Sequence, residues 1–97
     1  MTSYFLVHME ACHLVIRGLV QGVGFRWFVL REASARGLNG YTRNLMTGEV
    51  EVVAEGARPL LEQLLAAVRI GPRSAHVSHV EVTWEMASGR YTGFDIR

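Results

Sequence analysis

The segment VQGVGFR, residues 20–26, combines the features of an anion-binding loop at the start of a helix. It follows an apolar run and leads into a helical pattern, so several of its main-chain N–H groups have no helical partner. The glycines at 22 and 24 permit a tight turn and close approach of the backbone to a ligand. The helix dipole adds partial positive charge at the same place, and phosphate is a common occupant of such a site.

Arg26 lies in the first turn of this expected helix, where a cation is unfavourable. A cation there opposes the helix dipole and should cost on the order of half a kcal/mol. A bound anion would reverse that cost, because a guanidinium group matches the oxygens of phosphate in a bidentate fork. The alternative is a tight turn that carries an exposed surface arginine. The loop is neither a Walker A sequence nor a GxGxxG fingerprint, and by itself it leaves both interpretations open.

Asn44 is the second residue with a chemical use, and it lies in GYTRNLMTGEVE, residues 40–51. Asparagine is unfavourable inside strands and common at turns, so Asn44 could simply start a hairpin. Its amide also offers one acceptor and two donors. An uncharged group of this kind could hold and orient a water molecule.

The elements that must position these residues follow the order β-α-β-β-α-β, with a short last strand. Their expected extents are a strand over 12–16, a helix over 25–36, strands over 38–45 and 49–56, a helix from Pro59 that ends at Gly71, a strand over 75–85 and a final strand over 94–96. The helices show apolar residues at helical spacing, and the later strands alternate between apolar and polar residues. Glycines predict the left-handed end of the first helix, at Gly37, and the hairpin turn, at Gly48.

Two amphipathic helices need an apolar surface to cover, and alternating strands need one covered face. We therefore expect an α+β fold, a ferredoxin-like β-α-β-β-α-β sandwich. Its antiparallel sheet would carry both helices on one face and a short extra C-terminal strand. In EVEVVAEG, residues 49–56, we expect the glutamates Glu49, Glu51 and Glu55 on a solvated face, opposite a buried face of Val50, Val52 and Ala54.

Size and composition limit the classes of protein that are compatible with this chain. With 97 residues it should form one domain, over residues 10–97, after an N-terminal leader at residues 1–9. The formal net charge is +1, so the strong basic field of a non-specific nucleic-acid binder is missing. No apolar stretch reaches the roughly 18 residues needed to span a bilayer, and the single cysteine cannot form an internal disulfide. We expect a cytoplasmic protein.

Other residues are weaker candidates for chemistry. Of the four histidines, His76 and His79 are three apart on an expected strand and should face opposite sides, so we expect no metal site. Cys12 should be a buried core residue of the first strand. Trp27 lies off the apolar arc of its helix and is interpreted as surface cover rather than a binding platform. Arg17 is expected in a surface ion pair.

The paired motifs resemble the acylphosphatase family. The similar segments are RGLVQGVGFR at 17–26 and GYTRNLMTGEVE at 40–51, and the resemblance extends from about Cys12 to Arg97. It also includes the segment GPRSAHVSHVEV and the terminal FDIR. Each motif alone is weak, but the two at this separation are highly specific. Family members often have Asp-Gly where this chain has Thr47-Gly48, and an aromatic residue after the final arginine.

The resemblance implies an enzyme that hydrolyses acyl phosphates to carboxylate and inorganic phosphate. It implies Arg26 and Asn44 as catalytic residues, with Asn44 orienting the attacking water. The phosphate would be bound by the loop, namely Gln21, Gly22, Val23, Gly24, Phe25 and Arg26. No cofactor or metal is expected. The partner would be a small-molecule acyl phosphate, with phosphate or sulfate as competing anions; we expect a monomer that binds neither nucleic acid nor membrane.

Two alternatives differ in function from a free-standing acylphosphatase. A non-catalytic ferredoxin-like module could sense a ligand or bind RNA, although a sheet that reads RNA needs exposed aromatic and basic residues, and the long strand carries glutamates instead. Acylphosphatase-like domains also occur at the start of larger enzymes that process carbamoyl phosphate, and fold and motif together do not decide between these roles.

Overall fold

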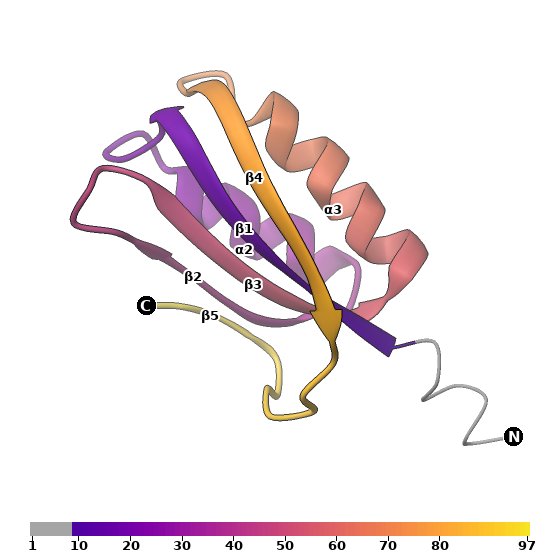
Figure 1. The fold of residues 1–97 in the computed structure, drawn as a ribbon. Coiled ribbons are helices and arrows are strands. Elements are labelled where there is room, and N and C mark those ends of the chain that lie inside the picture. The colour runs from indigo at the N-terminus through magenta and orange to yellow at the C-terminus, as the bar shows by residue number, and fades with distance from the viewer. Residues whose placement is uncertain (1–8) are drawn as a thin grey trace, which may run out of the picture.

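The computed structural model describes residues 9–97, which form a layer of helices on one face of a sheet (Figure 1). The elements are, in order, β1 (Met9–Leu19), α2 (Phe25–Ala35), β2 (Asn39–Asn44), β3 (Val50–Ala57), α3 (Arg58–Ile70), β4 (His76–Met86) and β5 (Phe94–Ile96). Residues 1–8 of the expected leader lie outside the described residues, and Met9 is the first residue of β1. The predicted element order is therefore confirmed.

The sheet has the strand order β4-β1-β3-β2-β5. β1 lies between β3 and β4 and is antiparallel to both, and β2 is antiparallel to β3. The short β5 pairs with β2 in parallel, so the sheet is mixed at this edge. The ferredoxin-like arrangement with both helices on one face is confirmed, and the short last strand extends it at the edge beside β2 (Figure 1).

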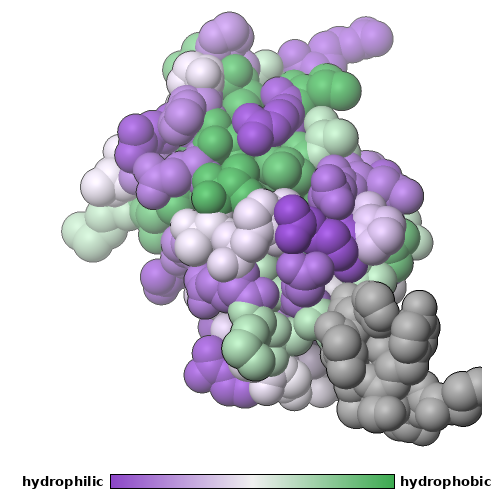
Figure 2. Space-filling model, turned by 45° about the vertical axis from the view of Figure 1, so that its right-hand side comes forward, coloured by the Kyte–Doolittle hydropathy of each residue, from purple (hydrophilic) through white to green (hydrophobic). Residues whose placement is uncertain are grey.

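The apolar core lies between the sheet and the two helices. From the sheet it takes Leu14 and Ile16 of β1 and Val52 of β3, each fully buried. The helices contribute their apolar faces, namely Phe25, Val29 and Ala33 of α2 and Leu61, Leu64 and Val68 of α3. An apolar area remains at the surface on the side that Figure 2 turns forward, and Ile70 at the end of α3 is 80% exposed. Burial is therefore nearly complete between the layers and incomplete at that side.

The helix ends and the hairpin turn form at the glycines and the proline that the sequence indicates. Gly37, with φ 66°, follows α2, and its N–H donates to the carbonyl oxygen of Ser34 at 3.0 Å. Gly48, with φ 97°, lies in the turn between β2 and β3, and its N–H donates to the carbonyl oxygen of Leu45 at 3.1 Å. Pro59 lies in the first turn of α3, as expected from its missing N–H. Local chemistry thus sets the ends of these elements.

The expectation of a solvated glutamate face on β3 is wrong for two of its three residues. Glu51 is 9% exposed and Glu55 is 5% exposed. Glu51 accepts a hydrogen bond from the Nε of Arg43 on β2 and pairs with the ring of His13 on β1. The alternation assigns these residues to the face opposite the helices correctly. It does not show that side chains of neighbouring strands and a later turn cover that face.

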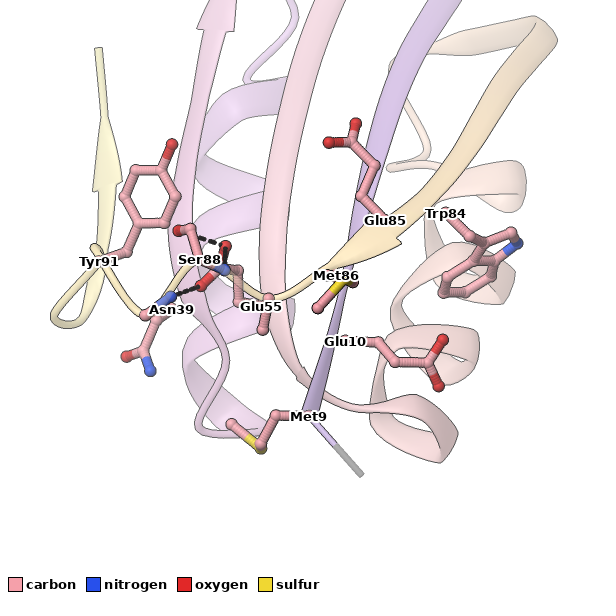
Figure 3. Close-up of a pocket in the computed structure, with 11 residues that line it drawn as sticks. Met9, Glu10, Asn39, Glu55, Trp84, Glu85, Met86, Ser88 and Tyr91 are labelled. Carbon is pink, nitrogen blue, oxygen red and sulfur yellow. Dashed lines mark hydrogen bonds between the residues drawn. The ribbon is translucent and has the colours of Figure 1, made fainter. Parts of the chain in front are cut away.

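Glu55 is covered by the connection between β4 and β5 (Figure 3). One carboxylate oxygen accepts hydrogen bonds from the N–H and the hydroxyl of Ser88, at 2.8 and 2.7 Å, and the other accepts from the N–H of Gly89 at 3.0 Å. Burial by itself raises the pKa of Glu55, but these hydrogen bonds outweigh burial and hold the pKa below its ordinary value. The carboxylate therefore anchors the start of this connection.

Candidate active site

The loop between β1 and α2 adopts the conformation that its glycines allow. Gly22 has φ 75° and Gly24 has φ 77°, both in the left-handed region that favours glycine. Gly24 is the N-cap of α2, no side chain caps the helix, and its first turn contains no acidic residue. The N–H of Phe28 donates to the carbonyl oxygen of Gly24 at 3.1 Å, so the N–H groups that precede it have no partner within the helix. This end of α2 is suited to an anion.

Arg26 lies in the first turn of α2 and is partly buried. Its Nη1 donates to the main-chain carbonyl oxygen of Arg97 at 3.1 Å, and the N–H of Arg97 donates in turn to Thr42 of β2. No Asp or Glu carboxylate within residues 9–97 forms an ion pair with Arg26. The hydrogen bond to Arg97 therefore holds one nitrogen of the guanidinium group. No acidic side chain in the described part of the chain neutralises its charge.

Asn44 is the last residue of β2, and it lines the same small cavity as Arg26. The cavity has a volume of about 130 Å³ and is lined by Val20, Gly22, Gly24, Phe25, Arg26, Trp27 and Asn44. Pockets for drug-sized ligands are larger, roughly 300–1,000 Å³, so this one suits a group of about the size of phosphate. The structure thus brings together the two predicted catalytic residues and both loop glycines.

Gln21 and Val23, also predicted to bind phosphate, do not line this cavity. The side-chain nitrogen of Gln21 donates to two main-chain carbonyl oxygens of the β2–β3 turn, those of Leu45 and Glu49, each at 2.8 Å. Val23 packs against the core, and its carbonyl oxygen accepts a hydrogen bond from the hydroxyl of Ser74 at 2.8 Å. The side chain of Gln21 and the carbonyl group of Val23 therefore hold the loop in place through hydrogen bonds to other segments.

Trp27 was not expected at the site, yet it lines the cavity beside Arg26. Trp27 is 61% exposed, because the apolar face of α2 is formed by other residues. The sequence signal for this placement was its position immediately after Arg26 in the first helical turn. Arg17 behaves as expected, since its Nε forms an ion pair with Glu49 at 2.5 Å, and a second contact reaches Glu81.

A larger hollow among the described residues lies elsewhere. It is lined by residues at the far ends of β1 and β4 and in the connection that leads to β5, among them Glu10, Trp84, Met86 and Tyr91 (Figure 3). It includes neither Arg26 nor Asn44 and no residue of the loop. The larger hollow therefore does not contain the residues that the sequence predicts for the site, whereas the small cavity brings together a helix N-terminus, a cation and an amide.

The remaining candidates for chemistry are also accounted for. Cys12 is buried in the core, and burial raises the pKa of its thiol to about 11, so it is a poor nucleophile at neutral pH. Within residues 9–97 no group of three or more His, Cys, Asp or Glu side chains is placed to hold a metal ion. No helix of the described part of the chain has the length and apolar character needed to cross a membrane.

Comparisons with known proteins agree on one family. The sequence profile of the acylphosphatase family matches residues 12–96. An acylphosphatase of Chlorobaculum tepidum is 54% identical over 70 residues, covering 72% of this chain and 76% of that protein. The structure of the acylphosphatase from Bacillus subtilis matches with a TM-score of 0.88 at 35% identity, over 91% of this chain and 98% of that one.

One matching structure belongs to a much longer protein, of which this chain covers only a small part. Full-length HypF in a phosphate- and nucleotide-bound form matches with a TM-score of 0.84 at 28% identity, over 92% of this chain and 12% of that one. The same fold is therefore found as a small part of a longer protein. These matches disfavour the alternative of a non-catalytic sensing or RNA-binding module.

Proposed function

The chain belongs to the acylphosphatase family and is an enzyme that hydrolyses acyl phosphates, and on this basis we propose which of its residues bind and attack the substrate. In this proposal Arg26 and the main-chain N–H groups of loop 20–26 bind the phosphoryl group. Asn44 orients the attacking water. The observation that supports these roles is that Arg26, Asn44 and the loop glycines line one small cavity, although they come from separate parts of the chain.

Phosphate binding in this proposal uses charge and geometry together. The free N–H groups at the start of α2 point toward the anion, and the guanidinium of Arg26 adds a full positive charge beside them. As the phosphoryl group is transferred, charge shifts over its oxygens. Donors that are already in position stabilise this charge without having to reorganise. The unfavourable position of Arg26 in the helix is explained, because the substrate supplies the opposite charge.

The chemical step needs few groups. Water held by the side-chain amide of Asn44 attacks phosphorus, and the bond from phosphorus to the acyl oxygen breaks with its electron pair on the carboxylate. A carboxylate is a good leaving group and requires no general acid. The proton of the water passes to a phosphoryl oxygen, so the products are the carboxylate and inorganic phosphate. Neither a nucleophilic side chain nor a metal is required by this route.

Hydrolysis of benzoyl phosphate in the presence of EDTA tests these roles. We expect Arg26→Ala and Asn44→Ala each to lower kcat by roughly 10²–10³, the usual effect of removing one preorganised group. Arg31→Ala, which removes an exposed arginine farther along the same helix, is the matched control and should keep the wild-type rate. Wild-type turnover in either site variant would exclude the assigned role of that residue, and loss of all activity in EDTA would exclude the metal-independent route.

The same proposal includes a monomeric, cytoplasmic enzyme for which phosphate and sulfate are competing anions. Both anions carry the tetrahedral oxygens that the helix end and Arg26 would bind. The alternative role, as a domain of a larger enzyme, is supported by the matches to part of HypF. Turnover by this chain on its own would show that the site needs no other domain, and a lack of turnover in the wild type would favour that second role.

A further inference from the structure

We infer that Gln21 is a positioning residue for hydrolysis, because its side-chain amide sets the place of Asn44 relative to the phosphate loop. The inference rests on the proposed function of Arg26 and Asn44. It differs from the expected role of Gln21 as a phosphate ligand, since its side-chain nitrogen is already occupied by the carbonyl oxygens of Leu45 and Glu49.

The sheet holds Asn44, which pairs with Val50 at the end of β2, but it does not by itself fix where the loop after β1 lies relative to Asn44. β1 and β2 are not neighbours, because β3 lies between them. The last pairs with β3 on this side are Ile16 with Val50 and Asn44 with Val50, and β1 continues to pair with β4 as far as Leu19. The loop after β1 and the turn after β2 both extend beyond these pairs, at the same end of the molecule (Figure 1). Contacts outside the strand ladder must therefore hold them together.

Gln21 makes such a contact, and it does so at both ends of the turn. Its nitrogen donates to Leu45, the residue after Asn44, and to Glu49, the residue before Val50, each at 2.8 Å. The turn is itself closed by a hydrogen bond of 2.8 Å from the N–H of Leu45 to the carbonyl oxygen of Glu49. An amide has two donor hydrogens, so both are used. A single side chain of the loop thus fixes the closed turn that begins beside Asn44.

A second contact reaches the same turn from β1, but it is less suited to this role. Arg17, at the end of β1, forms an ion pair with Glu49, but its side chain is 52% exposed. Exposed pairs of long side chains contribute little and are weakened by salt. Gln21 instead contacts main-chain oxygens, which have less freedom to move than side chains. We therefore expect the position of Asn44 to depend on Gln21.

Gln21→Met tests this dependence, because methionine has a similar length and no donor. A displacement of about 1 Å in a catalytic group can lower the rate by roughly 10². We expect kcat for benzoyl phosphate to fall roughly 10- to 100-fold, while the inhibition constant of inorganic phosphate changes by less than about threefold. The inhibition constant should change little because Arg26 and the N-terminus of α2, which would bind the phosphate, remain in place. Thr47→Ala is the matched control, since its hydroxyl bonds only within the turn, to Glu49, and it should keep activity within about threefold.

A double-mutant cycle distinguishes positioning of Asn44 from a general effect on the fold. In an Asn44→Ala background, Gln21→Met should lower kcat by less than about threefold, because the group that it positions is already gone. An equal loss in both backgrounds, or wild-type kcat for Gln21→Met, would overturn the inference. Gln21→Asn, which keeps the amide but shortens its reach, carries the same test if Gln21→Met does not fold.

The cycle also separates this inference from the proposed function. If Asn44→Ala hydrolyses benzoyl phosphate as fast as the wild type, the proposed role of Asn44 is wrong and the positioning role of Gln21 falls with it. If Asn44→Ala is impaired and Gln21→Met is not, the proposed function stands and only the inference about Gln21 is rejected.

Discussion

Replacing Arg26 by alanine is expected to remove most of the hydrolysis while leaving the unliganded fold about as stable as before. Two effects oppose each other in the free protein. Removing a cation from the first turn of α2 relieves its conflict with the helix dipole, by about 0.3–1 kcal/mol. Losing the hydrogen bond of 3.1 Å to the carbonyl oxygen of Arg97 costs about 0.5–1.5 kcal/mol before any discount for its exposure to solvent.

The net change in the free energy of unfolding should therefore stay within about 1 kcal/mol. In a domain of this size such a change moves Tm by no more than about 4–8 °C. The effect on the reaction is larger, because a donor that stabilises the charge of the transition state contributes about 2.7–4 kcal/mol, or roughly 10²–10³ in kcat. This variant should therefore lose most of its activity while its free energy of unfolding changes little.

Two assays measure the separation. Hydrolysis of benzoyl phosphate gives kcat, and thermal unfolding with and without inorganic phosphate gives the stabilisation by the bound anion. Phosphate at about 100 times its Kd should stabilise the wild type by about 2.7 kcal/mol. The same concentration should stabilise Arg26→Ala far less, and Arg31→Ala as much as the wild type.

Arg26→Lys refines the result, since lysine keeps the charge but loses the bidentate fork. It should recover part of the stabilisation by phosphate and little of the turnover. Wild-type turnover in Arg26→Ala, or an undiminished gain in Tm from phosphate, would refute the reasoning. So would a fall in Tm large enough to unfold the variant at the assay temperature.

Three further predictions concern other parts of the structure. Because hydrogen bonds hold the pKa of Glu55 below its ordinary value, its contribution to stability is present above the unfolded pKa of about 4.3 and is lost as pH falls through the lower folded value. Glu55→Gln should therefore flatten the acid limb of a stability–pH curve, whereas Glu85→Gln, at an exposed position on β4, should leave that limb unchanged. Trp27 lines the cavity, so phosphate should change its fluorescence, and Trp27→Phe, but not Trp84→Phe, should abolish the response. Gly40→Ala should lower Tm strongly or prevent folding, since φ is 146° and a Cβ would lie 1.9 Å from a carbonyl oxygen of β3; an unchanged Tm would contradict this steric argument.

Local signals were sufficient to predict most of the fold. The alternation of β3 predicts which of its side chains face the helices, and Val50, Val52 and Ala54 are indeed fully buried. The apolar stripe of α3 likewise predicts its contact with the sheet. These patterns repeat at the period of the strand or helix, so a short stretch of sequence contains them whole.

The alternation along a strand does not show whether other segments cover the side chains on a given face of the sheet. Glu51 and Glu55 were expected in solvent because they alternate with apolar residues. They are buried because His13, Arg43 and the turn at 88–89 come from distant parts of the chain and lie over them. A pattern of period two distinguishes one face of a strand from the other, but it carries no information on later elements that pack there.

For this protein the sequence by itself determined the order of the elements and the family, and it predicted an anion-binding loop, because each depends on residue types at fixed short spacings. Only the tertiary structure decided that Asn44 shares a cavity with Arg26, that Trp27 lines it, and that Gln21 spans the gap to the turn. These contacts depend on β3 lying between β1 and β2 and on how far the chain continues past the last residue that pairs with β3. Both are set by packing between segments that are far apart along the chain.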